Sequence, residues 1–251
     1  MLELVAALSL FVALHSIPAV PAVRGRLIAA IGRPAYFGSY SVVSLLTLGW
    51  VFYAALSVDY IPLWDVAPWQ AHVTFLAAPI GLFFVLAGLL SVNPLSISVR
   101  QGDIPGAIVR ITRHPVLVGF LFWSLGHVVP NGDLRSVILF GGFALFSLGG
   151  MAMTEKRARK RLGNAWSAAA AKNATIPFAA MLSGETRLAV DGPMLLAAAL
   201  TGLTVWWLLA GGHVMLFGAD PMAYFRSLTM SSPYAAAISA PAARARYRAD
   251  R

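Results

Sequence analysis

Long apolar runs separated by short polar connections dominate the chain. A helix needs about 20 mainly apolar residues to cross the hydrocarbon core of a bilayer. Six runs approach that length: residues 2–20, 38–58, 72–92, 115–129, 134–153 and 193–213. The fourth run is short, and we expect it to form a tight helical hairpin with the fifth around the PNGD turn at 130–133. The pattern predicts an all-α fold, a polytopic membrane bundle of about six transmembrane helices.

Composition supports a membrane protein over a soluble one. Of the 251 residues, 59% are hydrophobic and 12% charged, whereas a soluble domain carries about 25% charged residues. The absence of cysteine excludes disulfides, thiolate metal sites and catalytic thiols. The net charge of +9 does not indicate nucleic acid, because excess Lys and Arg normally lie in the cytoplasmic loops of membrane proteins.

The charges between the apolar runs predict the orientation. Basic residues follow the first, third and fifth runs: Arg24, Arg26 and Arg33, then Arg100, Arg110 and Arg113, then Lys156, Arg157, Arg159, Lys160 and Arg161. The other connections carry acidic or balanced charge. By the positive-inside rule both termini lie on the outer, periplasmic side. We expect a multi-pass protein of a bacterial inner membrane, with one transmembrane domain over 1–213 and a C-terminal extension, 214–251, that is largely disordered toward its end.

Two of the five histidines fall well inside apolar runs. These are His15, in "FVALHSIPAV", and His127, in "FWSLGHVVP". A polar ring in hydrocarbon needs a partner, so an intramembrane histidine is by default a candidate functional residue. The alternative is a hydrogen bond between helices, which membrane bundles use routinely. His72 and His213 lie near the outer interface, where an amphipathic ring is ordinary.

The fifth histidine belongs to an Arg113-His114-Pro115 motif at the inner boundary of the fourth run. Proline suits the first turn of a helix, where its missing N–H is not needed. Arg113 and His114 would then lie at headgroup level beside a helix N-terminus, which favours anions. Two readings stay open on spacing alone: an interfacial anchor, or a site for a carboxylate such as a cofactor's propionate.

The spacing of the histidines restricts any shared metal centre. His127 follows His114 by 13 positions, a rise of about 20 Å, so these two cannot bind one iron from a straight helix. His15 and His127 come from different runs and can face each other, although their depths differ by about 8 Å. Two imidazoles without a thiolate or carboxylate at similar depth suit a haem iron better than zinc.

The surroundings of the pair permit a macrocycle. Phe11, Phe122 and Trp123 would provide flat apolar walls, and Gly119 and Gly126 would leave room between helices. The same residues are also typical of close helix packing in membranes.

These segments resemble the NnrU-like membrane proteins, a family that includes the zeta-carotene isomerases. The resemblance rests on "LHSIPAVPAVRGRL", "RITRHPVLVGFLFWSLGHVVPNGDLRSVILFGGF" and "GHVMLFG", and it is strongest over 1–163. It implies haem b and a redox-controlled cis–trans isomerisation of a polyene. It also implies that His15 and His127 are the axial metal ligands and that His114 is a supporting or exchangeable one. From the residues themselves, Arg113 and Trp123 are candidate cofactor contacts, and His114 and Arg113 are the candidate catalytic residues. The implied substrate is lipid-soluble, a polyene or quinone, and a redox partner and membrane lipid are the implied partners.

Two other functions fit parts of the same pattern. Arg113 and His114 before an apolar helix, with Glu155 about 40 positions later, also resemble the integral-membrane methyltransferases that use S-adenosylmethionine. In that reading His15 and His127 have no role. The second alternative is a non-enzymatic assembly factor for denitrification or respiratory haem proteins.

Overall fold

The computed structural model describes residues 1–16, 20–102 and 104–223. All regular structure in these residues is helical, and strand-like pairing is limited to two isolated bridges. The predicted all-α class is therefore confirmed. The end of the 214–251 extension, which is predicted to be disordered, lies outside the described residues, since these stop at 223.

Each predicted apolar run coincides with a helix. The helices are α1 (Leu2–Ser16), α3 (Arg33–Ser57), α4 (Pro68–Leu90), α6 (Pro115–Asn131), α7 (Leu134–Leu162) and α10 (Gly192–Trp207). Four stretches are long and apolar enough to cross a membrane: Arg33–Ser57, Pro68–Leu90, Leu134–Lys172 and Gly192–Phe217. Among the described residues α1 and α6 are shorter apolar helices. The chain is a multi-pass membrane protein, while the count of six spans and the outer position of both termini stay predictions.

Shorter helices connect these elements. They are α2 (Pro21–Ile31), α5 (Ile108–Ile111), the 3-10 turn η2 (Gly163–Ala165), α8 (Trp166–Lys172), α9 (Ala179–Leu182), the π-helical turn η3 (Leu208–Gly212) and α11 (His213–Phe217). The described chain forms two compact units, one from Met1 to Gly202 and one that starts at Leu203. In the second unit, His213 Nδ1 lies 2.8 Å from the carbonyl oxygen of Ala219. The predicted single domain over 1–213 stays a prediction.

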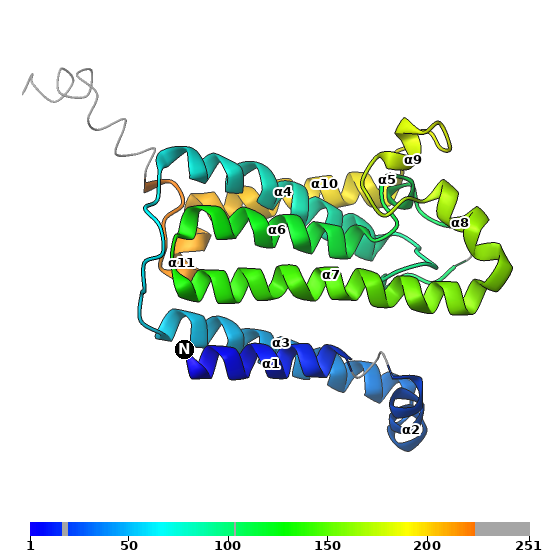
Figure 1. Cartoon of the computed structure of the whole chain (residues 1–251), viewed down its shortest axis with the longest axis horizontal. Helices are drawn as coiled ribbons and strands as arrows, with labels where there is room; N and C mark the ends of the chain where they lie inside the picture. The colour runs from blue at the N-terminus through cyan, green and yellow to red at the C-terminus, as the bar shows by residue number, and fades with distance from the viewer. Residues whose placement is uncertain (17–19, 103, 224–251) are drawn as a thin grey trace, which may run out of the picture. The chain divides into compact units, whose positions relative to one another are not determined.

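Glycines bring α4 and α6 into close contact in the first unit (Figure 1). A Cβ atom on Gly119 would lie 2.4 Å from the carbonyl oxygen of Gly81, and one on Gly81 would lie 2.5 Å from that of Gly119. Seven residues further along α6, a Cβ on Gly126 would lie 2.7 Å from Cβ of Ala77. Small residues let membrane helices approach this closely. The expectation that Gly119 and Gly126 leave room for a macrocycle is therefore wrong, because α4 fills that space.

A proline near the end of α6 adds a polar contact to the same interface. Pro130 has no N–H, so it leaves the carbonyl of Gly126, four residues earlier, without its helical donor. The hydroxyl of Thr74 on α4 donates to this carbonyl at 2.6 Å. An orphaned carbonyl in hydrocarbon is costly, so this bond ties α4 to α6 at one level.

The predicted hairpin between α6 and α7 is present. Gly132 takes a left-handed conformation, with φ of 59°. The buried carboxylate of Asp133 then caps α7 by accepting hydrogen bonds from the backbone N–H and hydroxyl of Ser136, at 3.0 and 2.7 Å. This short turn makes α6 and α7 antiparallel neighbours.

Aromatic and aliphatic side chains join α1, α3 and α7 on the other side of the first unit. The buried members of this core are Leu4, Ala7, Phe11, Val51, Ala54, Ala55, Leu139, Phe140 and Phe143. Trp123 and Phe120 of α6 pack against the same core from the hairpin side. Since α1 and α6 both contact α7, α7 is the element that the two histidine-bearing helices share.

Replacing Gly119 by alanine should destabilise the protein, because the new methyl group would overlap the α4 backbone. Overpacking of this kind costs about 1–3 kcal/mol. That cost corresponds to a fall of several degrees in the thermal midpoint, at roughly 2–4 °C per kcal/mol for a chain of this size. Gly149→Ala on α7 is the matched control, since a Cβ there meets nothing within 4 Å. Equal unfolding temperatures for the two variants in detergent would contradict the close contact.

Candidate functional site

His127 is oriented by its own helix. Its Nδ1 lies 2.7 Å from the carbonyl oxygen of Trp123, one turn earlier on α6. A carbonyl only accepts, so Nδ1 carries the proton and Nε2 carries the lone pair. The imidazole lies between aromatic rings, with centroids 4.7 Å from Trp123 and 5.0 Å from Phe140 of α7. Histidines that bind metals are commonly held in this way through the other ring nitrogen.

His15 repeats this arrangement on α1. Its Nδ1 lies 2.8 Å from the carbonyl oxygen of Phe11, four residues earlier. Its ring centroid is 4.0 Å from Phe11, 5.7 Å from Tyr40 of α3 and 5.5 Å from Phe146 of α7. In both intramembrane histidines the lone pair therefore lies on the same nitrogen, Nε2.

The two histidines lie against different levels of α7. Phe140 and Phe146 are six residues apart on that helix, a rise of about 9 Å. The ring of Phe143 lies between the two levels, 5.6 Å from Phe11 and 6.1 Å from Trp123. Two axial nitrogens on one iron would be about 4 Å apart, twice a metal–imidazole bond. The two levels on α7 are separated by about twice that distance.

We call this group of side chains the aromatic–histidine cluster; its members are His15, His127, Phe11, Trp123, Phe140, Phe143 and Phe146. The predicted wall residue Phe122 lies elsewhere, 6.3 Å from Phe84 on the α4 side of α6. Trp123 does belong to the cluster. Among the described residues no group of three or more His, Asp or Glu could hold a metal ion.

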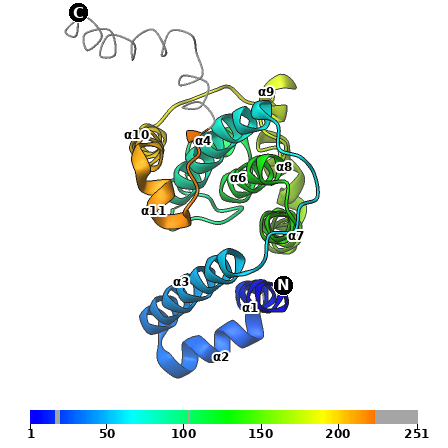
Figure 2. The ribbon, with the colours of Figure 1, turned by 90° about the vertical axis from the view of Figure 1, so that its left-hand side faces the viewer.

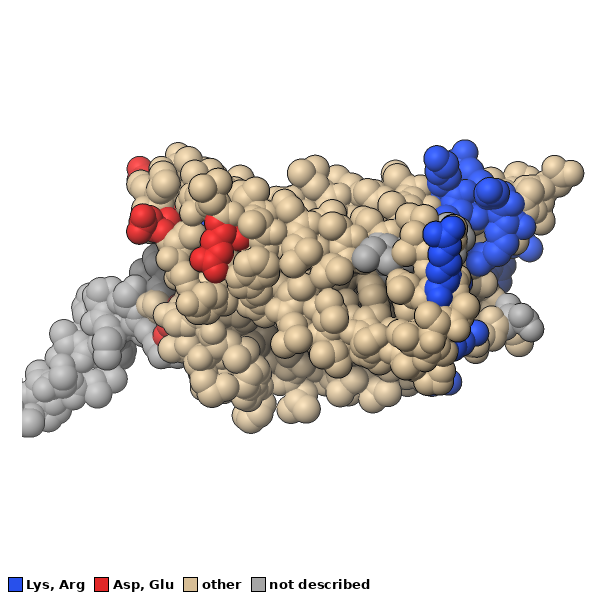
Figure 3. All heavy atoms as spheres, turned by 90° about the horizontal axis from the view of Figure 1, so that it is seen from below, with Lys and Arg blue, Asp and Glu red and all other residues tan. Residues whose placement is uncertain are grey.

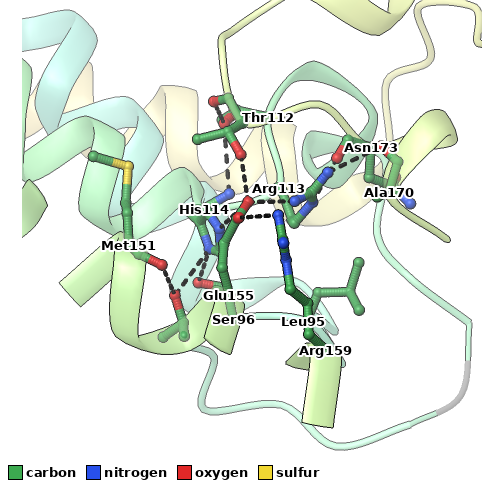
Figure 4. A network of polar contacts seen from close by, with 12 residues as sticks. Leu95, Ser96, Thr112, Arg113, His114, Met151, Glu155, Arg159, Ala170 and Asn173 are labelled. Carbon is green, nitrogen blue, oxygen red and sulfur yellow. Dashed lines mark hydrogen bonds and ion pairs between the residues drawn. The ribbon is translucent and has the colours of Figure 1, made fainter. Parts of the chain in front are cut away.

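Arg113 lies at the opposite end of α6 in a polar network (Figure 4). Its buried guanidinium pairs with the carboxylate of Glu155 on α7. It also donates to two backbone carbonyls, from Nε to Asn173 at 2.7 Å and from Nη2 to Ala170 at 2.9 Å. The ring of Trp166 covers it at 4.7 Å. The anion that Arg113 binds in this structure is therefore the carboxylate of Glu155, which the protein itself supplies. A contact between Arg113 and a haem propionate stays a prediction.

His114 is fully buried beside Arg113, at the residue that precedes α6. Its Nδ1 lies 2.8 Å from the hydroxyl of Ser96 and 3.3 Å from that of Thr154, and its Nε2 lies 3.7 Å from Oε1 of Glu155. Burial, with the charge of Arg113, lowers the pKa of His114 from 6.5 to about 4 against the opposing effect of Glu155. The imidazole is therefore neutral at pH 7.

Hydrogen bonds of this network connect the segment after α8 to the start of α6. The backbone N–H of Arg113 donates to Ala174 at 2.8 Å, and the hydroxyl of Thr112 donates to the carbonyl of Thr175 at 2.7 Å. The hydroxyl of Thr175 in turn donates to Glu155 at 2.8 Å. Sequence reasoning singled out Arg113, His114 and Glu155 but missed the hydroxyl partners. Because His114 precedes His127 by 13 positions, these two histidines lie about 20 Å apart along α6.

These features define the class: an all-helical, multi-pass membrane protein with histidines in an aromatic membrane interior. Residues 3–221 match the family described as NnrU protein. The chain belongs to the NnrU family. Two curated relatives are the chloroplastic 15-cis-zeta-carotene isomerases of Zea mays and Arabidopsis thaliana, each 33% identical over 84 residues. That match covers 34% of this chain and only 23% of each relative. No solved structure matches.

Stability should fall as the pH is lowered from about 6.5 toward 4. The folded pKa of His114 is about 4 and its unfolded value is 6.5, so across this window the unfolded chain takes up a proton that the folded chain does not. The stabilisation is present above pH 6.5 and is lost toward pH 4, at roughly 1 kcal/mol per pH unit. Thermal midpoints across this range measure the effect. His114→Asn should flatten the profile, and an unchanged slope in that variant would contradict the assignment.

Glu155→Gln should destabilise the protein by about 2–3 kcal/mol, because the buried charge of Arg113 loses its carboxylate partner. The loss is smaller than for a fully buried ion pair, since the side chain of Glu155 is partly exposed. Glu185→Gln, at an exposed site, is the matched control. Unfolding midpoints in the same detergent compare the two variants. If Glu155→Gln unfolds at the wild-type temperature, the pair does not hold the network.

Proposed function

We propose that the protein is a membrane-embedded isomerase that acts on a cis double bond of a lipid-soluble polyene, with haem b as its cofactor. The observation that carries the proposal is the aromatic–histidine cluster, in which two oriented imidazoles lie among aromatic rings inside membrane helices. Membership of the NnrU family and the isomerase names of the two curated relatives support a carotenoid-type substrate.

The cluster's side chains suit an apolar, rod-like substrate. Phenylalanine and tryptophan rings offer flat surfaces to a conjugated chain and exclude water. No charged side chain belongs to the cluster, so a charged solute would lose its hydration there without compensation. Lateral entry from the bilayer would bring a polyene to this level without crossing water.

The proposed cofactor would be held by an Nε2 atom of the cluster. His127 and His15 are the candidate ligands, and the offset of about 9 Å between their aromatic partners on α7 favours one of them at a time. When bound, haem supplies redox-dependent coordination close to the double bond. The protein's part is to hold the ligating imidazole by its Nδ1 hydrogen bond and to keep water away.

Location and partners follow from the same proposal. A haem that must be reduced requires an electron donor, so a redox partner is part of it. We place the protein in a bacterial inner membrane; both curated relatives are named as chloroplastic, and the multi-pass topology suits either membrane.

Purified protein should convert a 15-cis polyene such as cis-zeta-carotene into its trans isomer under anaerobic, reducing conditions. Chromatographic separation of the isomers measures conversion. Haem-free protein is the control for the uncatalysed rate. Conversion no faster than in that control would contradict the isomerase assignment.

Haem retention tests the ligands. Single-histidine ligation predicts that one of the variants His15→Ala and His127→Ala loses most of its haem, roughly tenfold or more, while the other retains it. His72→Ala, on α4 and outside the cluster, should retain haem like the wild type. Absorbance of the haem in purified variants, normalised to protein, is the measurement. Full retention in both variants would contradict a haem at this cluster, and equal loss from both would contradict single ligation.

A second candidate is a methyltransferase that uses S-adenosylmethionine. It is favoured by one observation, the meeting of Arg113, His114 and Glu155 in one network. Calorimetric titration with S-adenosylmethionine tests it, with Glu155→Gln as the variant expected to lose binding. A protein that carries no haem and binds no S-adenosylmethionine would leave the assembly-factor alternative.

A further inference from the structure

Helix α2 differs in direction from the helices around it. It runs across the ends of α1 and α3 (Figures 1 and 2) and packs against α3. Gly32, with φ of 80°, separates α2 from α3 and permits the sharp change of direction. A helix of 11 residues spans only about 16 Å, too little to cross a bilayer, which suits a position along its surface.

One face of α2 is apolar and unburied. Val23, Leu27 and Ile31 are spaced four residues apart and are 40%, 39% and 50% exposed. Residues at this spacing form one stripe along a helix. Arg24 and Arg26 are also exposed, and at 100° per residue they lie on opposite sides of Leu27, about 60° and 100° away. Arginines at both edges of an apolar stripe are typical of a helix that lies in the membrane interface.

The positive charge on and around α2 is not balanced by acidic residues. No Asp or Glu occurs between residues 4 and 58, and within 1–16, 20–102 and 104–223 no carboxylate forms an ion pair with Arg24 or Arg26. Arg24 is instead an electrostatic neighbour of Arg157 on α7, which has the same charge. Figure 3 shows Lys and Arg gathered toward one end of the visible surface, the end where α2 and the last turns of α7 lie in Figure 1. Asp and Glu lie toward the other end of that surface.

We propose that α2 and Arg157 of α7 form a binding site for the headgroup of an anionic phospholipid. The phosphate would lie between Arg24 and Arg157, where two cations repel each other in the absence of an anion. The apolar stripe of Val23, Leu27 and Ile31 would contact the acyl chains below it. A lipid supplies both chemistries at once, whereas a free anion leaves the stripe without a partner.

Titration of the full-length protein in neutral detergent tests the site. The probes are dioctanoyl-phosphatidylglycerol, dioctanoyl-phosphatidylcholine and inorganic phosphate, with binding followed by calorimetry. Each basic residue near a membrane surface contributes about fivefold to binding of anionic lipid. The double variant Arg24→Gln/Arg157→Gln should therefore bind phosphatidylglycerol roughly 25-fold more weakly. Arg100→Gln/Arg187→Gln, at exposed basic positions outside α2, should bind like the wild type.

Two further variants separate lipid binding from misfolding. Arg24→Lys/Arg157→Lys keeps the charge and should restore most of the affinity. Leu27→Ser keeps the charge but interrupts the stripe, and it should weaken lipid binding. Three results would overturn the proposal: wild-type affinity in the double glutamine variant, equal affinity for phosphatidylcholine, or full competition by inorganic phosphate at the lipid's own concentration.

Discussion

A hydrogen bond from an imidazole Nδ1–H to the carbonyl one helical turn earlier is the interaction on which the functional interpretation depends. In hydrocarbon a histidine without a partner is costly, and both His15 and His127 satisfy Nδ1 in this way. With Nδ1–H as the donor, the lone pair of each neutral ring lies on Nε2. It also turns the two rings toward the aromatic side chains of α7, which makes that helix the shared wall of the site.

The other contacts hold α6 in place at its two ends. At one end, Arg113 and His114 join the start of α6 to Glu155 of α7 and to the segment after α8. At the other end, the buried Asp133 caps α7 directly after the turn. Between them, the close contact of Gly119 with Gly81 presses α6 against α4. With α4 packed on one side of α6, Trp123 and His127 lie on the side that contacts α7.

Much of the fold could be predicted from the sequence, because apolar runs of membrane length have few alternatives. All six runs coincide with helices, and the PNGD turn forms the expected hairpin. The apolar pattern does not predict helix α2. Its 11 residues are too few for a membrane span, and Gly25 and two arginines interrupt its apolar character. The sequence does not show that Gly119 and Gly126 face α4, because a single sequence does not say which helix packs against them.

The candidate site was predictable only in its residue types. The sequence indicates His15 and His127 because polar rings are rare in hydrocarbon. The predicted difference of about 8 Å in their depths is close to the rise of about 9 Å between Phe140 and Phe146, their partners on α7. The partners of His114 were not foreseeable, since Ser96 and Thr154 are 18 and 40 residues away in the chain. Their hydroxyls carry no pattern that marks them as neighbours.

The distance between α1 and α6 tests whether His15 and His127 contact α7 at two separate levels along that helix. The chain has no cysteine, so spin labels can be placed at Leu10 and Leu125, which are both exposed, and their separation measured by pulsed electron paramagnetic resonance with and without haem. The account predicts the same distance in both states. A shift on the order of 9 Å on haem binding, enough to bring the two imidazoles to one iron, would contradict it.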